Sequence, residues 1–258
     1  WTYFECKNGK LGKHLMKNIN SVIFNLFIVL KLIVKLVKQT ANKFSKIYKI
    51  YILKDEFTIQ VKKWFADQGD QTLRLEYPEL TSDSIVFDLG GYLGDFSAAI
   101  IERYNCKIYI FEPHPEYFSK CVERFSSYEN VTVLNYGLAD KDGEFLLSNQ
   151  SDASSFINPN HTKSDGINCI TRDFSSVLRE LDVTNIDLMK INIEGGEFPL
   201  MEYIISCGKQ AIVRQYQIQF HNFVENAVER RIQISRSLSE THDRTWCYTF
   251  VWENWRKN

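Results

Sequence analysis

The stretch Ser84–Asp95, with the sequence S-I-V-F-D-L-G-G-Y-L-G-D, decides the fold class. Residues 84–89 form a run rich in Ile, Val and Phe, which is typical of a buried strand. Glycines follow at positions 90, 91 and 94, and residues 96–104 have a helical pattern. A strand, a Gly-rich turn and a helix in this order predict the first unit of a nucleotide-binding α/β fold, with the ligand at the turn.

Length and composition fit one α/β domain with an appendage. The chain has 258 residues, of which 44% are hydrophobic and 24% charged, as is ordinary for a globular protein. Its net charge of −1 conceals an asymmetry: residues 1–54 hold eleven Lys, no Arg and one acid, a net +10, so the other 204 residues carry −11. An acidic body and a basic arm without Arg disfavour a nucleic-acid partner.

Residues 1–69 are predicted to form a basic helical region. Lys31, Lys35 and Lys38 fall on one face of a mainly apolar helical segment, residues 19–38. Its longest charge-free run has 13 residues, whereas a spanning helix needs about 20. Two interpretations stay open: contact with the anionic inner face of the membrane by a cytoplasmic protein, or packing on the catalytic domain or in a dimer.

Two further features concern cysteines and the chain start. None of the six cysteines has C-x-x-C spacing, which favours reduced, buried thiols over a zinc site or a disulfide framework. The chain begins with Trp1 rather than Met, which leaves open that it is part of a longer protein.

From residue 70 to 258, apolar strands alternate with helical segments, which predicts a mostly parallel sheet with helices on both faces. Glu112 ends the second strand, 18 residues after Gly94, where an acid can accept the ribose hydroxyls of a nucleotide. Asp142-Gly143 predicts a hairpin that pairs residues 144–147 antiparallel. Residues 148–166 are predicted to be a functional or disordered loop, and Trp246–Trp252 a single strand that closes the sheet.

Five motifs carry a family resemblance. They are D-x-G-G-x-x-G at 88–94, F-E-P at 111–113, G-L-A-D at 137–140, D-L-M-K-I-N-I-E-G-G-E at 187–197 and Q-F-H at 219–221. In this order they resemble the FkbM family of S-adenosylmethionine-dependent methyltransferases, from about Phe65 to the C-terminal F-V-W-E-N-W. The resemblance implies the Rossmann-like class I methyltransferase fold: a seven-stranded, mostly parallel sheet with an antiparallel last strand, here with a helical N-terminal extension. It also implies S-adenosylmethionine as cofactor and a sugar or small-molecule hydroxyl as acceptor.

The resemblance also assigns site residues. The cofactor set is Asp88, Gly90, Gly91, Tyr92 and Gly94 under the methionine half, Glu112 with Pro113 at the ribose, and Leu138 and Asp140 at the adenine. The set facing the methyl group and the acceptor is Lys190, Asn192, Glu194 and Glu197. The sequence departs from the commonest family pattern at Asn192, usually Asp, and at Gln219, often an acid; a bacterial subgroup is similar in both places.

The candidates for the general base are Glu194, Glu197 and His221. Histidine has a suitable intrinsic pKa, whereas the two glutamates before a helix also fit a role in complementing the helix dipole. Asn192 can donate or accept a hydrogen bond but cannot act as a base. Lys190 lies on a buried strand and is expected to pair with Asp88 or Glu194. No spacing indicates a metal site, although Asp187, Glu194 and His221 could converge, and we predict none.

Three functions fit the pattern. The first is S-adenosylmethionine-dependent O-methylation of a sugar, glycan or small-molecule hydroxyl. The second is a non-catalytic, cofactor-binding scaffold at the membrane surface, which Asn192 and Gln219 in place of acids would suit. The third is an NAD-dependent enzyme, which Tyr92 disfavours because it replaces the second glycine of the dinucleotide pattern.

Overall fold

The computed structural model describes residues 31–32, 34–35, 37–40, 45, 55–148 and 166–258. The chain divides into two compact units, residues 1–59 and 60–258. The described residues within 31–40 are helical, but most of the segment 19–38 lies outside the described residues, so membrane contact stays a prediction. In the part of the chain that the structure describes, no helix is long and apolar enough to cross a membrane.

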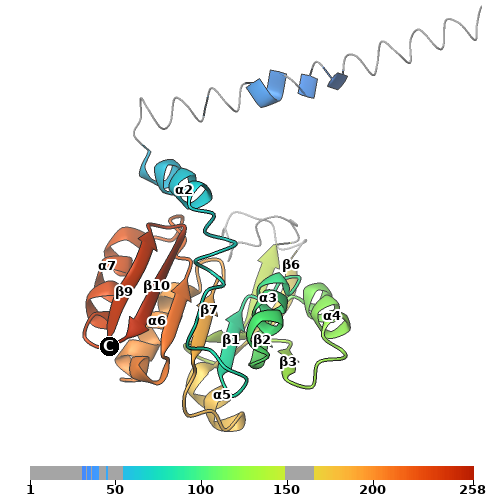
Figure 1. Cartoon of the computed structure of the whole chain (residues 1–258), viewed down its shortest axis with the longest axis vertical. Helices are drawn as coiled ribbons and strands as arrows, with labels where there is room; N and C mark the ends of the chain where they lie inside the picture. Colours follow the sequence, from blue (N-terminus) through green and yellow to red (C-terminus); the bar gives the residue numbers. More distant parts are fainter. Residues whose placement is uncertain (1–30, 33, 36, 41–44, 46–54, 149–165) are drawn as a thin grey trace, which may run out of the picture. The chain divides into compact units, whose positions relative to one another are not determined.

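The second unit is built on a seven-stranded sheet of order β3-β2-β1-β7-β8-β10-β9 (Figure 1). Five neighbouring strands, β3, β2, β1, β7 and β8, run parallel to one another, and β10 runs antiparallel to both of its neighbours, β8 and β9. This confirms the predicted mostly parallel sheet with an antiparallel last strand. The strands are β1 (Ile85–Leu89), β2 (Lys107–Phe111), β3 (Val131–Leu134), β7 (Leu188–Ile191), β8 (Gln215–Ile218), β9 (His242–Tyr248) and β10 (Trp252–Lys257).

The prediction of one closing strand over Trp246–Trp252 is wrong. The segment is the bend of a hairpin, in which Val251 N–H donates to Tyr248 O at 2.8 Å and Phe250 has φ 61°. The aromatic pattern runs on through the bend because aromatic residues of both strands pack into one cluster, and this continuity hid the turn. The two-strand closure places β10 between β8 and β9.

A second sheet, of order β4-β6-β5, is formed by the strands that fall between β3 and β7 in the chain. It contains β4 (Gly137–Ala139), β5 (Gly143–Ser148) and β6 (Gly166–Asp173). β5 pairs antiparallel with β6, which confirms the antiparallel pairing predicted for residues 144–147. The hairpin predicted at Asp142-Gly143 is wrong: β4 and β5, on either side of this turn, do not pair with each other, because β6 lies between them and pairs with both. The predicted loop over residues 148–166 lies almost entirely outside the described residues.

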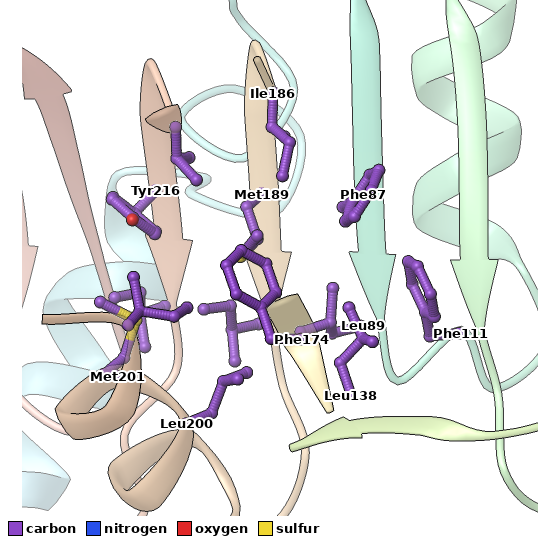
Figure 2. Packing of buried hydrophobic residues seen from close by; sticks show 14 of the residues in the cluster. Phe87, Leu89, Phe111, Leu138, Phe174, Ile186, Met189, Leu200, Met201 and Tyr216 are labelled. Carbon is purple, nitrogen blue, oxygen red and sulfur yellow. The ribbon is translucent and has the colours of Figure 1, made fainter. Parts of the chain in front are cut away.

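Alternating side chains give the sheet two apolar faces. Phe87 and Leu89 of β1 belong to one buried cluster (Figure 2), and Val86 belongs to another. The first cluster includes buried residues of α5 (Phe174–Glu180), α6 (Glu197–Ser206) and α7 (Ala227–Leu238). The second includes buried residues of α3 (Asp95–Tyr104) and α4 (Pro115–Arg124). Helices therefore cover both faces, and the strand ends are left to form the site.

Trp64, near the end of α2 (Glu56–Ala66), packs within the second unit. This ring is 2% exposed and lies with its centroid 5.1 Å from Tyr248 and 5.8 Å from Trp246. A Cβ at Gly69 would lie 2.4 Å from the Trp64 ring, so only glycine fits there. This contact lies just before residue 70, where the domain boundary stays a prediction.

We expect Trp64→Ala to lower the free energy of unfolding by about 3–5 kcal/mol, because it empties a buried aromatic site. Phe65→Ala is the matched control: its ring is 64% exposed, so we expect a change within about 0.5 kcal/mol. Urea unfolding followed by circular dichroism compares the two. If Trp64→Ala changed the free energy of unfolding as little as Phe65→Ala does, Trp64 would not contribute to the core.

Candidate active site

The carboxyl ends of β1, β7 and β8 meet along one edge of the sheet. Asn192 N–H donates to Leu89 O at 3.1 Å, and Gln219 N–H donates to Ile191 O at 2.9 Å. On the other side, Gly90 N–H donates to Phe111 O at 3.0 Å. The ends of β1, β2, β7 and β8 therefore lie along one edge, and the predicted site residues that follow these strands lie there too, as the topology requires.

The glycine turn after β1 is shaped by its protein neighbours. Gly90 has φ 82°, and a Cβ there would lie 2.0 Å from the carbonyl oxygen of Asn192. A Cβ at Gly91 would lie 2.3 Å from Ile110 Cγ2. Both glycines let the turn close against β7 and β2.

A buried ion pair joins this turn to β7. Lys190 Nζ donates to Asp88 Oδ1 at 2.9 Å, to Gly90 O at 2.8 Å and to Leu89 O at 3.3 Å. Asp88 Oδ2 accepts a hydrogen bond from Ser97 Oγ of α3 at 2.7 Å. The predicted pairing of Lys190 with Asp88 is confirmed, and the three ammonium protons are all engaged. Ser97, which carried no sequence signal, completes the pair.

Glu112 lies at the end of β2 and is 5% exposed. Its two carboxyl oxygens accept hydrogen bonds from Tyr92 N–H at 2.7 Å and His114 N–H at 2.8 Å. Burial raises the pKa of Glu112 to about 7, against the opposing effect of these two bonds. Tyr92 itself has φ 50°, so its backbone is held in a conformation that non-glycine residues rarely adopt.

The segments assigned to the adenine lie next to Glu112. Asn135 Nδ2 donates to Glu112 O at 3.0 Å and to Pro113 O at 3.2 Å. These bonds connect the residues after β2 to the short segment between β3 and β4. Leu138 of β4 is buried, and its side chain packs in the main core beside Leu89 (Figure 2). Asp140 directly follows β4.

Gly94 takes φ 78° at the start of α3, where a Cβ would lie 2.6 Å from the Phe125 ring. The last glycine of the turn therefore lets α3 begin against α4. All the predicted cofactor residues lie at or next to the ends of β1, β2 and β4.

His221, just after β8, is held by Glu197 at the start of α6. Glu197 Oε1 lies 2.8 Å from His221 N and 2.9 Å from His221 Nδ1, and its Oε2 accepts from Gly195 N–H at 2.8 Å. Since a carboxylate only accepts, Nδ1 carries the proton and Nε2 is the free nitrogen of the neutral ring. Glu197 is fully buried. The sequence left two roles open for Glu197, a general base or a residue that complements the helix dipole. In the structure, its carboxyl group holds the imidazole of His221.

Glu194 faces the other side of the imidazole. Its Oε2 lies 3.5 Å from His221 Nε2, and its backbone has φ 52°. Burial raises the pKa of Glu194, while the charge of His221 opposes that shift. Burial lowers the pKa of His221, but the hydrogen bond and charge of Glu197 and the charge of Glu194 outweigh it, so the net pKa is raised above its usual 6.5.

Two other predicted residues are placed clearly. The Oδ1 atom of Asn192 is buried and has no hydrogen-bond partner among the described residues, which leaves an acceptor for a ligand. Asp187 lies at the opposite end of β7, where its carboxyl accepts from Ile85 N–H at 2.9 Å, so it does not converge with Glu194 and His221. In the described ranges, no three His, Cys, Asp or Glu side chains are arranged to hold a metal.

Phe223 is a site residue that the sequence interpretation missed. Its ring centroid lies 5.1 Å from that of His221, and the side chain is 54% exposed. The available signal was its position two residues after the histidine, in the order Q-F-H-N-F.

A comparison with known protein families agrees with the fold. Residues 88–244 match the family described as the methyltransferase FkbM domain, which is more than half of the chain. The chain belongs to this family of S-adenosylmethionine-dependent methyltransferases, and its cofactor is S-adenosylmethionine. Among curated proteins, none matches the sequence.

Several solved structures are similar at low identity. An rRNA methylase from Streptococcus thermophilus is 14% identical, with 69% of this chain and 89% of that chain covered and a TM-score of 0.43. A precorrin-6Y C5,15-methyltransferase from Geobacter metallireducens is 10% identical, with 72% and 84% covered and a TM-score of 0.38. Aeropyrum pernix fibrillarin with bound S-adenosylmethionine is 11% identical, with 71% and 70% covered and a TM-score of 0.38.

We expect Lys190→Met to lower the free energy of unfolding by about 3–5 kcal/mol, because it leaves the buried Asp88 charge without its partner. Lys120→Met is the control, since its ion pair with Glu116 is exposed on both sides and exposed ion pairs contribute little to stability. Urea titration of both variants gives the comparison. A Lys190→Met variant as stable as Lys120→Met would contradict the role assigned to the buried pair.

Proposed function

We propose that this methyltransferase transfers its methyl group to a hydroxyl oxygen of a sugar, a glycan or another small acceptor. The observation that carries the proposal is the imidazole of His221: Glu197 holds its Nδ1, and its Nε2 faces the partly exposed Glu194. An oriented imidazole at the carboxyl edge of the sheet is the group that removal of a hydroxyl proton requires.

The residues present fit S-adenosylmethionine. Each oxygen of Glu112 accepts one backbone N–H, and since a carboxylate has about four acceptor positions, it can also take two ribose hydroxyls. The unpartnered Oδ1 of Asn192 is an acceptor suited to the ammonium of the methionine half. The turn 90–94 would lie beneath that half, and Pro113, Leu138 and Asp140 would flank the base.

The proposed chemistry rests on the imidazole. When bound, S-adenosylmethionine would supply an electrophilic methyl group for the acceptor oxygen, with S-adenosylhomocysteine as the leaving group. His221 Nε2 takes the hydroxyl proton. Glu197 keeps the ring in the tautomer that leaves Nε2 free to do so, and Glu194 stabilises the imidazolium that results.

Lys190 and Asn192, which were also predicted to face the methyl group and the acceptor, support this arrangement without transferring a proton. Lys190 has its three protons engaged by Asp88 and by the carbonyl oxygens of the turn, so it positions the turn. Asn192 offers an acceptor at the end of β7 and does not titrate. Of the three candidates for the base, Glu197 holds the imidazole and Glu194 lies beside its Nε2, so we assign the base to His221.

The affinity for S-adenosylmethionine should depend on the ionisation of Glu112. Ribose hydroxyls donate to the carboxylate form, and the pKa of Glu112 is about 7. Below that pH the dissociation constant should rise, by up to about tenfold per pH unit. Calorimetry from pH 5.5 to 8.5 measures this, with Glu112→Gln as the variant in which the dependence disappears. An unchanged pH dependence in Glu112→Gln would exclude Glu112 as its source.

Substitutions of the imidazole and its partner should separate catalysis from binding. We expect His221→Ala to lower kcat by about 10²–10⁴-fold, the usual contribution of a general base. In the wild type kcat should rise with pH through the raised pKa of His221. Glu197→Gln removes the charge that raises this pKa, so the acidic limb should move to lower pH, which a purely structural role would not cause.

The test of the proposal uses a library of hydroxyl compounds, methyl-labelled cofactor and mass spectrometry. Labelled product that depends on His221 supports it. Cofactor binding by calorimetry without transfer to any hydroxyl compound would favour the non-catalytic alternative.

A further inference from the structure

The surface next to the proposed base combines an exposed ring with two hydrogen-bond acceptors. His221 Nε2 and Glu194 Oε2 lie 3.5 Å apart. The Phe223 ring lies 5.1 Å from the imidazole, at an interplanar angle of 44°. Glu194 and His221 are partly exposed at this edge, and Phe223 is the most exposed of the three.

The backbone fixes Phe223 in this position. Phe220, just before His221, is buried against Phe198 with ring centroids 5.0 Å apart. Val224, just after Phe223, packs against the main core, and its N–H donates to His221 O at 3.5 Å. The turn 221–224 is thus anchored on both sides, and it presents Phe223 outward.

The two acceptors and the ring point to one kind of acceptor molecule. Hydroxyls on adjacent carbons can donate to two acceptors this close together, whereas a single hydroxyl would leave one of them unpaired. A ring that carries such hydroxyls has an apolar face, and an exposed aromatic side chain provides a surface for it.

On the basis of the function proposed above, we propose that the acceptor is a ring-borne vicinal diol. One hydroxyl binds His221 Nε2, its neighbour binds the Glu194 carboxylate, and the face of the ring stacks on Phe223. Phe223 is then a positioning residue that selects ring acceptors. Pyranosides and catechols share this chemistry, and the experiment separates them.

The experiment measures binding by saturation-transfer NMR in the presence of S-adenosylhomocysteine, which occupies the cofactor site without reaction. The probes are cis-1,2-cyclohexanediol, cyclohexanol, 1,2-propanediol, catechol and methyl α-mannopyranoside. We expect the wild type to bind the cyclic diol about tenfold more tightly than cyclohexanol and than 1,2-propanediol. Of the last two probes, the one bound more tightly identifies the source of the diol.

Two variants should lose different preferences. Phe223→Ala should abolish the preference for the cyclic over the acyclic diol and keep that for the diol over cyclohexanol. Phe223→Tyr should restore the ring preference. Glu194→Gln should weaken the preference for the diol over cyclohexanol and keep the ring preference. Tyr128→Ala removes an aromatic ring that is 43% exposed outside the site, and it should behave as the wild type.

The inference is overturned if the wild type binds the cyclic diol no better than 1,2-propanediol, or if Phe223→Ala keeps the ring preference. The affinity of Phe223→Ala for S-adenosylhomocysteine, expected within twofold of the wild type, checks that the variant is folded. Methyl transfer to acyclic or isolated hydroxyls would sink this inference alone. The proposed function fails separately, if no hydroxyl of any kind is methylated.

Discussion

The buried ion pair between Lys190 and Asp88 is the interaction on which the site depends. The two residues face each other across neighbouring parallel strands, and the ammonium also holds two carbonyl oxygens of the glycine turn. Two charges taken out of water are costly unless each is well bonded. Here the remaining bonds come from the turn and from Ser97, so the cost of burial is offset only when the turn has its observed shape.

The same face of the sheet continues this polar arrangement. Gln217 lies beside Lys190, and Asn254 lies beside Gln217, on adjacent strands, and all of them are buried. Tyr77 contacts Gln217 from outside the sheet. Each member has a defined partner, and a buried polar row of this kind fixes the register of the strands, because a shift by one residue would leave its members unpaired.

The edge of the sheet then divides into two halves around β7. The ends of β1 and β2 supply the turn and Glu112, which suit the cofactor, and the end of β8 supplies His221 and Phe223, which suit the acceptor. Asn192, Glu194 and Glu197 follow β7 and lie between these halves. Tyr92 and Glu194, which follow β1 and β7, are two of the seven described non-glycine residues with positive φ.

Local patterns in the sequence were sufficient for most of the fold. The apolar runs and glycines indicated the order of strands and helices. The D-G pair indicated that β5 is an antiparallel strand, but β5 pairs with β6 and not with β4, the strand before the turn. The bend at Phe250 was missed because aromatic residues continue through it. The carbonyl oxygen of Asn192, which requires a glycine at position 90, was not indicated because it is about a hundred residues away in the chain. The same distance problem hid Ser97.

For the candidate site, the sequence indicated the residues and the pairing of Lys190 with Asp88, but not the other contacts. Glu197 was ambiguous because a glutamate at a helix start is common, and only the position of His221 beside it shows what it holds. Phe223 followed a recognised histidine but had no pattern of its own. Contacts between segments that are distant in the chain were the part that local patterns could not supply.

The most direct measurement of the central claim is the chemical position of the transferred methyl group. A reaction with carbon-13 methyl-labelled S-adenosylmethionine and the acceptor found in the hydroxyl library, analysed by NMR, identifies the atom that the methyl carbon is bonded to. The account predicts an O-methyl ether that the His221→Ala variant forms far more slowly than the wild type. A labelled methyl group on nitrogen or carbon, or an O-methyl ether formed equally fast by both proteins, would contradict it.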